Sequence, residues 1–290
     1  MTTKSAPASS LHRTIVFSHA NSFPACTYRK LFAGWRAAGY EVHALERFGH
    51  DPRYPVTMNW PHLVAQLKDF IEREVGHPAY LVGHSLGGFL GMMAASRHPH
   101  LAQGVVVLDS PVLHGWKSAG IGLAKRMGRM DRVMTPARIA AERTNHWASL
   151  EAAHAHFITK PKFAAFHPDV LGDYLQHGTV THADGVSRKL SFEREVEAAI
   201  YMTMPHGLVQ EFRRHPHRCP VAFIGGTHSR ETRRVGTEGI RLIAGKRMSW
   251  IKGTHLYPFE DPDTTVAEVL KWLERFQTDP HLAPRPAATA

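Results

Sequence analysis

Cysteine is scarce in this sequence: Cys26 and Cys219 are the only two among 290 residues. Two cysteines cannot build the disulfide framework on which small secreted domains rely. The chain also lacks an apolar run long enough to span a bilayer, so we expect no membrane partner. Its first thirteen residues are polar and have no apolar centre, unlike a secretory signal. Together these absences predict a cytoplasmic protein.

Acidic residues are fewer than basic residues. There are 25 Asp and Glu residues against 35 Lys and Arg residues, and the formal net charge at pH 7 is +10. The basic residues gather at 125–129, 213–218 and 230–234. A nucleic-acid-binding protein usually concentrates such charge on a recognisable module with aromatic platforms, and we find no such module, so we expect no nucleic-acid partner. Solvated helix faces account for most of the charge, and attraction of an anionic substrate is the alternative.

A recognisable metal site is missing too, although the chain has 22 histidines. Three pairs of histidines stand two residues apart, at 98 and 100, 154 and 156, and 215 and 217. Residues two apart do not share one helix face, and no pair has convincing carboxylate or cysteine partners. We therefore predict neither a metal nor a cofactor.

What the sequence does contain is a regular alternation of strand-like and helix-like segments. Its length and its apolar content of 43% suit one large domain with an insertion. The predicted strands are residues 14–18, 40–45, 79–83 and 104–109, and the predicted helices between them are 24–38, 60–74 and 86–98. This alternation predicts an α/β fold with a mostly parallel sheet covered by helices on both faces.

The alternation stops at Pro111 and resumes at Pro220. The segment between them is helical in period without a strong strand, and its candidate helices are 118–130, 135–141, 149–157, 168–177 and 194–202. We therefore predict a core of residues 11–110 and 219–278, an inserted helical cap of residues 111–218, and disordered tails at 1–10 and 279–290.

Inserted lids commonly roof an active site and decide its specificity. The candidates for an apolar lining from this cap are Trp116, Trp147, Phe157, Phe166, Tyr174, Tyr201, Met202 and Met204. Each of them alone is more often a core residue of its own domain.

One pentapeptide, Gly83-His84-Ser85-Leu86-Gly87, carries most of the chemical information. It lies between an apolar strand-like run and a helix of small apolar residues, with Ser85 at the apex of the turn. A turn this sharp crowds the neighbouring backbone, and the two glycines avoid that crowding because they have no Cβ atom. A G-x-S-x-G pattern between a strand and a helix is typical of a nucleophile elbow, so we predict that Ser85 is a nucleophile.

A serine hydroxyl needs a base within hydrogen-bond reach. His255 follows the last predicted strand, residues 248–251, and precedes a helix predicted over 265–276 with a capping box of Thr265 and Glu268. A histidine in that loop can reach across the edge of the sheet. We therefore predict that His255 is the base.

From residue 14 to residue 276 the chain resembles the α/β-hydrolase family. In that family the loop after an early strand usually carries a His-Gly pair and supplies one N–H group to an oxyanion hole. The matching pair here is His19-Ala20, so the resemblance implies the backbone N–H of Asn21 as one donor. The residue after the nucleophile, Leu86, would supply the second.

The acid of the implied triad is not at its commonest place. In the matching Gly-x-x-Asp context after the strand 221–224, this sequence has Ser229. A serine cannot stabilise an imidazolium as a carboxylate does. Asp109 is our preferred acid because it ends a predicted strand, and ligand-facing residues of open α/β sheets collect at the carboxyl ends of strands. Glu231, two residues beyond the usual place, is the alternative acid.

These residues predict a serine hydrolase that cleaves a carboxylic ester or thioester through a Ser-His-acid triad and an acyl-enzyme. The partner is then a small-molecule acyl substrate, whose identity and chain length the sequence does not specify, and the oligomeric state stays open. Family members that displace halide use an aspartate nucleophile, so Ser85 disfavours that reaction. An acyltransferase and a lactone or C–C bond hydrolase use the same site and stay alternatives. A catalytically weak ligand-binding protein of the same fold is a further alternative.

Overall fold

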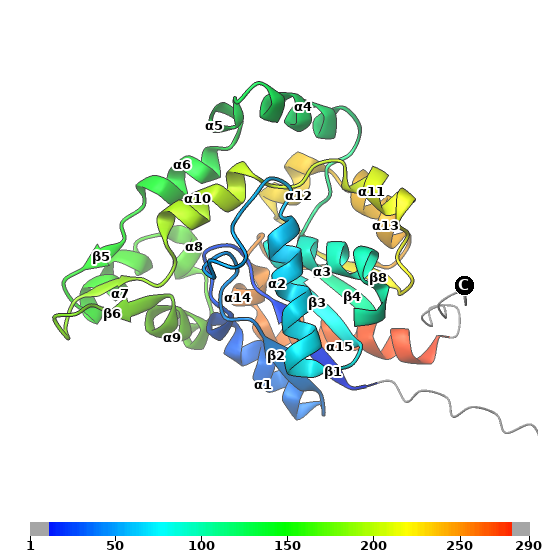
Figure 1. Cartoon of the computed structure of the whole chain (residues 1–290). Helices are drawn as coiled ribbons and strands as arrows, with labels where there is room; N and C mark the ends of the chain where they lie inside the picture. The colour runs from blue at the N-terminus through cyan, green and yellow to red at the C-terminus, as the bar shows by residue number, and fades with distance from the viewer. Residues whose placement is uncertain (1–11, 280–290) are drawn as a thin grey trace, which may run out of the picture.

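Six parallel strands form the central sheet, in the order β2-β1-β3-β4-β8-β9 (Figure 1). The computed structural model describes residues 12–279. The strands are β1 (Thr14–Ser18), β2 (Glu41–Ala44), β3 (Ala79–His84), β4 (Ala102–Leu108), β8 (Val221–Gly226) and β9 (Met248–Ile251). The predicted fold class is confirmed, because strands alternate with helices and the sheet is parallel throughout.

The central strands β1, β3, β4 and β8 are buried along their whole length because both faces of the sheet are covered. Along β4, Val106 and Leu108 belong to the hydrophobic cluster on one face, and Val105 and Val107 belong to the cluster on the other. Successive side chains of a strand point to opposite faces, so a strand buried on both sides needs an unbroken apolar run.

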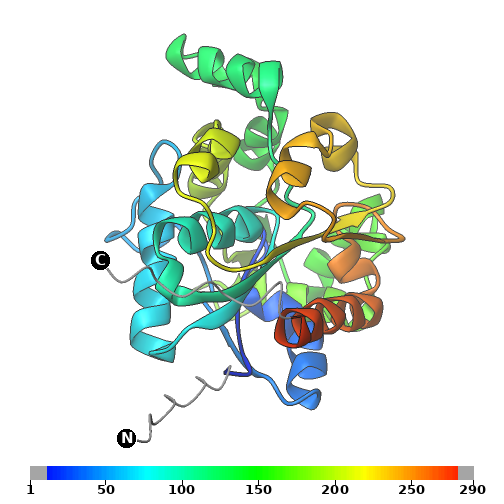
Figure 2. The same cartoon turned by 90° about the vertical axis from the view of Figure 1, so that its right-hand side faces the viewer.

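Helices cover the two faces in separate groups (Figures 1 and 2). Trp35 of α1 (Arg29–Ala37) and Leu273 of α15 (Pro262–Thr278) pack in the first cluster. The second cluster takes residues from α2 (Pro61–Phe70), α3 (Leu86–Arg97), α11 (Leu208–Arg214) and α13 (Glu238–Ala244). Shorter turns are η1 (Ala25–Tyr28), η2 (Ile71–Val75), η3 (Pro99–Leu101), α12 (Arg230–Val235) and α14 (Tyr257–Glu260).

Most of the segment between β4 and β8 is helical, as predicted. Before α11 its helices are α4 (Gly115–Arg126), α5 (Met130–Val133), α6 (Thr135–Glu142), α7 (Leu150–Ile158), α8 (Pro161–Ala164), α9 (Pro168–His177) and α10 (Arg194–Met202). The segment also contains three short strands that the sequence pattern did not reveal. A small antiparallel sheet has the order β5-β7-β6, formed by β5 (His146–Trp147), β7 (Arg188–Leu190) and β6 (Thr179–Thr181). Strands of two or three residues are too short to show a period of two in the sequence.

The cap segment is attached to the core in two different ways. Its aromatic half shares the first hydrophobic cluster, where Phe166 packs on Phe259 with ring centroids 4.9 Å apart and Tyr174 packs on Phe23 at 5.4 Å. In contrast, Ser118 is the buried residue of α4, and that helix stands clear of the sheet in Figure 2. The predicted boundaries of the core and the cap stay a prediction.

The C-terminal helix starts earlier than predicted. Asp261 is its N-cap and accepts the N–H of Thr264 at 3.1 Å, so the predicted capping box of Thr265 and Glu268 is wrong. The Asp-Pro pair explains the earlier start, because aspartate is a strong N-cap and proline favours the first helical position. The predicted tails, 1–10 and 279–290, lie outside the described residues except for Asp279, whose N–H donates to the carbonyl of Arg275 at 3.0 Å.

None of the helices in residues 12–279 is both long enough and apolar enough to span a bilayer.

Candidate active site

Ser85 occupies the sharp turn between β3 and α3. Its backbone has a φ of +52° and a ψ of −113°, a conformation that a residue with a side chain rarely adopts. The flanking glycines are required by close approach: a Cβ on Gly83 would lie 2.3 Å from the carbonyl carbon of Gly87, and one on Gly87 would lie 1.9 Å from the oxygen of Ser18. The N–H of Ser85 donates to the carbonyl of Leu108 at 2.9 Å and ties the turn to β4.

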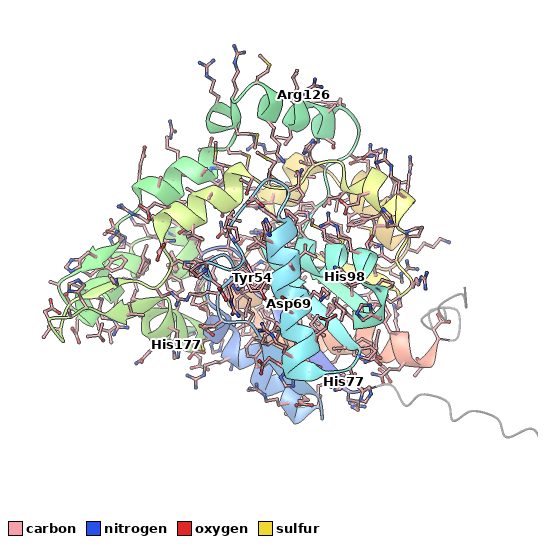
Figure 3. The ribbon with its side chains drawn as sticks, in the orientation of Figure 1. Tyr54, Asp69, His77, His98, Arg126 and His177 are labelled. Carbon is pink, nitrogen blue, oxygen red and sulfur yellow. The ribbon has the colours of Figure 1, made fainter. Side chains whose placement is uncertain are left out.

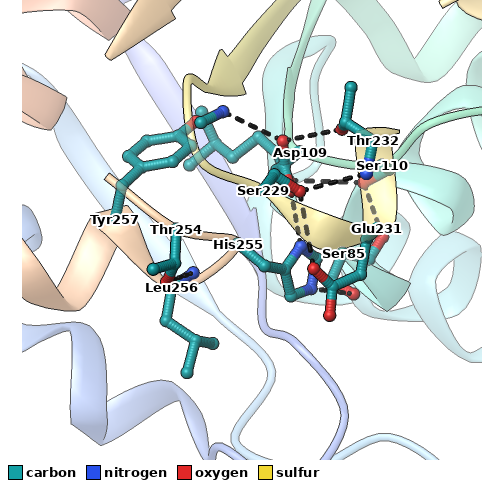
Figure 4. Close-up of polar contacts among 12 residues, drawn as sticks. Ser85, Asp109, Ser110, Ser229, Glu231, Thr232, Thr254, His255, Leu256 and Tyr257 are labelled. Atoms are coloured by element: carbon teal, nitrogen blue, oxygen red, sulfur yellow. Dashed lines mark hydrogen bonds and ion pairs between the residues drawn. The ribbon is translucent and has the colours of Figure 1, made fainter. Parts of the chain in front are cut away.

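His255 follows β9, and Figure 4 shows its ring between the side chains of Ser85 and Asp109. Its Nε2 lies 3.0 Å from Ser85 Oγ, and its Nδ1 lies 2.6 Å from Asp109 Oδ2. The loop is held by Glu260, whose carboxylate accepts the N–H of Thr254 at 2.9 Å and also its hydroxyl. The three side chains therefore form a continuous line of hydrogen bonds.

Asp109 is buried, and its carboxylate accepts a hydrogen bond from each of its polar neighbours. Its Oδ2 also accepts the hydroxyl of Ser229 at 2.5 Å, and its Oδ1 accepts the N–H of Gly226 and the hydroxyl of Thr232, each at 3.0 Å. The backbone φ of Asp109 is +48°, which turns the chain sharply after β4, and its N–H donates to Ile224 at 2.9 Å. This cradle supports the ionised form, because every partner donates a hydrogen bond.

The ionisation of Asp109 and His255 is coupled. Burial opposes the charge of Asp109, but the hydrogen bond and the charge of His255 outweigh burial and hold the pKa of Asp109 below its ordinary value. Burial also lowers the pKa of His255, but the hydrogen bond and the charge of Asp109 outweigh it and raise that pKa above the ordinary 6.5. The carboxylate assigns the ring proton to Nδ1 and leaves Nε2 free to accept the proton of Ser85.

Ser229 and Glu231, the other two positions considered for the acid, lie beside Asp109 and His255. Ser229, at the usual acid position, donates to Asp109 instead of contacting His255. Glu231 begins the turn of α12, where its Oε2 is 3.5 Å from Ser229 Oγ, and no hydrogen bond joins it to His255 in the described structure. The structure thus brings Asp109, and not Glu231, into contact with the histidine. Sequence analysis missed the supporting roles of Ser229 and Thr232, although both lie close to the usual acid position.

The peptide that joins Ala20 and Asn21 is held in one orientation. The carbonyl of Ala20 accepts Nδ1 of His19 at 2.7 Å and the N–H of Phe23 at 3.2 Å. No peptide bond in the described chain is cis, so the N–H of Asn21 points away from that carbonyl. Positive φ falls on Ser22, at +77°, and not on Ala20, which explains why alanine is accepted where the family usually has glycine.

Asn21, Leu86 and Ser85 line the same cavity, so the structure brings both predicted oxyanion donors to the nucleophile's side of the fold. Leu86 is the first residue of α3, where N–H groups lack partners within the helix and the helix dipole is positive. Two different elements thus bring the residues of both predicted donors to one cavity, and their role as an oxyanion hole stays a prediction.

Tyr28 and His84 connect the three loops of the site. From the sequence, His84 is expected to pack or hydrogen-bond within the turn, and no role is predicted for Tyr28. The hydroxyl of Tyr28 accepts the N–H of Ala20 at 3.0 Å and lies 2.8 Å from His84 Nδ1, while His84 Nε2 lies 2.9 Å from the carbonyl oxygen of His255. A carbonyl only accepts, so Nε2 of His84 carries the proton and Nδ1 accepts the hydroxyl of Tyr28. Burial lowers the pKa of His84 to about 3, which keeps its ring neutral near neutral pH.

A cavity of about 230 Å³ opens beside Ser85. Its walls are mainly apolar, with Trp60 and Phe89 from the core and Ile121, Met134 and Ile200 from the cap segment. Of the eight cap residues predicted to line a pocket, Tyr201 and Met204 do so. The prediction is wrong for the others, because most of them are buried in the hydrophobic cluster that the cap shares with the core, and Trp116 is 81% exposed.

The side chains of Asp109, Glu231 and His255 also form the one group in residues 12–279 whose possible metal-ligand atoms lie within 4.8 Å of one another. Both oxygens of Asp109 and Nδ1 of His255 are already engaged in hydrogen bonds. Coordination of a cation would have to break these bonds, so the geometry suits proton transfer better than metal binding.

Known proteins provide four comparisons: a family model, two relatives and one solved structure. The family model described as the alpha/beta hydrolase family matches residues 15–269. A chloroplastic pheophytinase of Arabidopsis thaliana is 39% identical over 51 residues, which cover 18% of this chain and only 10% of that protein. A putative non-heme haloperoxidase of Mycobacterium phage D29 is 23% identical over 264 residues, covering 86% of this chain and 83% of that protein. The solved structure of E-2-(acetamidomethylene)succinate hydrolase is similar with a TM-score of 0.72 and 19% identity, over 91% of this chain and 93% of that one, which shows a shared fold.

Proposed function

Since this chain belongs to the alpha/beta hydrolase family, we propose that it is a serine hydrolase that cleaves a carboxylic ester or thioester. The observation that carries the proposal is the line of hydrogen bonds from Ser85 Oγ through both ring nitrogens of His255 to Asp109. A nucleophile, a base and a group that orients the base are the three parts that acyl transfer by serine requires.

In the proposed mechanism, Ser85 Oγ attacks the carbonyl carbon of the substrate while Nε2 of His255 takes the hydroxyl proton. Asp109 keeps the proton on Nδ1 and stabilises the imidazolium that forms. The N–H groups of Asn21 and Leu86 stabilise the negative oxygen of the tetrahedral intermediate.

The remaining steps release the products. His255 gives its proton to the leaving alcohol or thiol, and the acyl group stays on Ser85. Water then gives a proton to His255 and attacks the acyl carbon. The bond to Ser85 Oγ breaks, His255 returns the proton to that oxygen, and the carboxylic acid is released. Asp109 is the proposed acid because it contacts the histidine and carries four donated hydrogen bonds, whereas Glu231 acts on the ring only through its charge.

The test is covalent labelling of the serine with a fluorophosphonate, followed by peptide mass spectrometry. We expect the label on Ser85 in the wild type and no label in Ser85→Ala or His255→Ala. His98→Ala is the matched control, because His98 lies at the far end of α3 (Figure 3) and we expect it to label like the wild type. Unlabelled wild-type protein is then tested with esters and thioesters of increasing acyl length, with Ser85→Ala as the inactive control.

Absence of labelling in folded wild-type protein would contradict the proposal and favour the catalytically weak ligand-binding protein. An acyltransferase would also label at Ser85 but would pass the acyl group to an added alcohol, thiol or amine in preference to water. Measuring both products in the presence of such an acceptor separates hydrolysis from transfer.

A further inference from the structure

A second and larger hollow, of about 1130 Å³, lies between α4 and α11. We call it the basic groove, because its charged side chains are Arg97, Lys125, Arg126 and Arg214 against the single carboxylate of Glu211. Figure 3 labels Arg126 on α4, the helix that stands clear of the sheet. Neither the family match nor the proposed mechanism uses this groove.

The positive charge of the groove is mostly unneutralised. Glu211 pairs with Arg97 at 2.6 Å. Arg126 and Arg214 are exposed, and no ion pair joins either guanidinium to a carboxylate among the side chains that the structure describes. Lys125 is fixed at the wall, where its Nζ donates to Asn59 Oδ1 at 2.7 Å. The groove therefore offers guanidinium groups that are not paired with a described carboxylate. Such groups bind phosphate oxygens well, because their N–H groups match the phosphate geometry.

The basic groove and the catalytic cavity share one wall. The chain bends at His206 and Gly207, and these two residues line both hollows. Helix α4 packs on this bend, where Ser118 Oγ accepts the N–H of Gly207 at 2.9 Å. The same helix contributes Ile121 to the cavity and Arg126 to the groove. A substrate that extends from Ser85 past the bend therefore meets cationic side chains.

The sizes of the two hollows differ in a way that constrains the substrate. The cavity beside Ser85 has about 230 Å³ and mainly apolar walls. The basic groove has about 1130 Å³ and is the larger of the two hollows. The acyl part of the substrate is thus compact and apolar, and the part that leaves has the greater space and the cationic surroundings.

We propose that the natural acyl donor carries a short apolar acyl group on a large phosphate-bearing carrier, with the carrier in the basic groove. This inference rests on the proposed function, because it uses Ser85 as the nucleophile. For a thioester donor, Ser85 Oγ adds to the acyl carbon, and the C–S bond breaks when the tetrahedral intermediate collapses. The departing sulfur takes the proton from His255, and water later releases the acid.

The first experiment compares two thioesters with the same acyl group. Butyryl-coenzyme A has a phosphorylated carrier, and butyryl-N-acetylcysteamine has the same thioester without phosphate. At low salt we expect kcat/KM to be at least about tenfold higher for butyryl-coenzyme A, and the ratio to fall as salt screens the groove. Butyryl-phosphopantetheine on a carrier protein, assayed in parallel, shows whether the phosphate comes from a free or a protein-bound carrier.

The second experiment reverses the charge of the groove. Arg126→Glu with Arg214→Glu should lower the ratio of the two kcat/KM values about tenfold, because anion attraction is lost. Arg213→Glu is the matched control: Arg213 is the exposed neighbour on α11, it lines a different hollow, and its reversal should leave the ratio unchanged.

Equal kcat/KM values for the two thioesters, or an equal effect of the control, would overturn the inference while leaving the proposed function standing. If neither thioester is hydrolysed and Ser85 is not labelled by the fluorophosphonate, the proposed function itself fails. The two failures are therefore distinguishable in the same set of assays.

Discussion

Ser229 donates a hydrogen bond of 2.5 Å to Asp109, the carboxylate that contacts His255. The residue at the family's usual acid position thus supports a carboxylate that comes from the neighbouring strand. The cause is the parallel register that pairs Leu108 with Ile224, because it places the end of β4 beside the loop that follows β8. Two positions 120 residues apart in the chain thereby meet behind one imidazole ring.

Removing the charge of Asp109 should abolish most of the activity. For Asp109→Asn we expect kcat to fall about 10³- to 10⁴-fold, because the ring tautomer is no longer enforced and the imidazolium loses its counter-charge. Glu231→Gln should change kcat by no more than about threefold, because exposed charges interact weakly. Steady-state kinetics on both variants, with circular dichroism as the folding control, measure the difference. The reverse ranking would reassign the acid to Glu231.

Exchanging Asp109 and Ser229 tests whether a carboxylate at either position can support the ring of His255. Asp109→Ser should be nearly inactive, and adding Ser229→Asp should recover at least about tenfold in kcat, because the carboxylate returns to the same side of His255. Assays of the single and double variants under one condition make the comparison. A double variant that is no more active than Asp109→Ser alone would show that the position after β8 no longer supports an acid.

The pH profile should report the raised pKa of His255. The base must be neutral to act, so kcat/KM should fall on the acid side with a midpoint above 6.5, the ordinary value for histidine. Glu231→Gln removes a negative charge that raises this pKa, so its midpoint should move to lower pH. His98→Gln, at the far end of α3, should leave the profile unchanged. A wild-type midpoint below 6.5 would contradict the coupling with Asp109.

Tyr28 should act as a positioning residue. Tyr28→Phe leaves the N–H of Ala20 and Nδ1 of His84 without partners in a buried place, so we expect a loss of about 1–3 kcal/mol in the free energy of unfolding. Because the oxyanion loop and the loop of His255 lose their connection, kcat should fall about tenfold with little change in KM. Thermal unfolding and steady-state kinetics measure the two effects.

Two comparisons test whether Tyr28 and His84 affect catalysis by positioning the loops or only through the stability of the protein. Tyr174→Phe removes another buried hydroxyl, which accepts a hydrogen bond of 2.8 Å from Arg143, and should lower stability without lowering kcat. His84→Gln retains an N–H that can reach the carbonyl of His255 and should keep more activity than His84→Leu. If Tyr28→Phe and Tyr174→Phe lower stability equally and neither changes kcat, the connection is structural only.

The elbow glycines provide a prediction on stability. Gly87→Ala places a Cβ atom 1.9 Å from the backbone oxygen of Ser18, which cannot be relieved by a side-chain movement, so we expect little folded protein. Gly91→Ala, one turn further along α3, meets neighbours at 3.6 Å and should be tolerated or stabilising by up to about 1 kcal/mol. Expression yield and thermal unfolding of the two variants compare them directly.

The sequence by itself determined the fold class and the position of the elbow. Both depend on patterns within short segments: apolar runs such as 104–108, helical periods between them, and the spacing of Gly83 and Gly87 around Ser85. It also pointed to His255, because a histidine in the loop after the last strand can reach across the edge of the sheet to the nucleophile. The fold class and the family resemblance are confirmed, and the catalytic roles stay predictions that the geometry supports.

Only the tertiary structure decided which carboxylate contacts His255, which residues support it, and where the basic groove lies. These depend on contacts between distant segments: the register of β4 against β8, the approach of Tyr28 to His84, and the packing of α4 on the bend at His206. A local pattern carries no information about such contacts, because hydrogen-bond geometry is set by the position of whole elements and not by the spacing of residues along the chain.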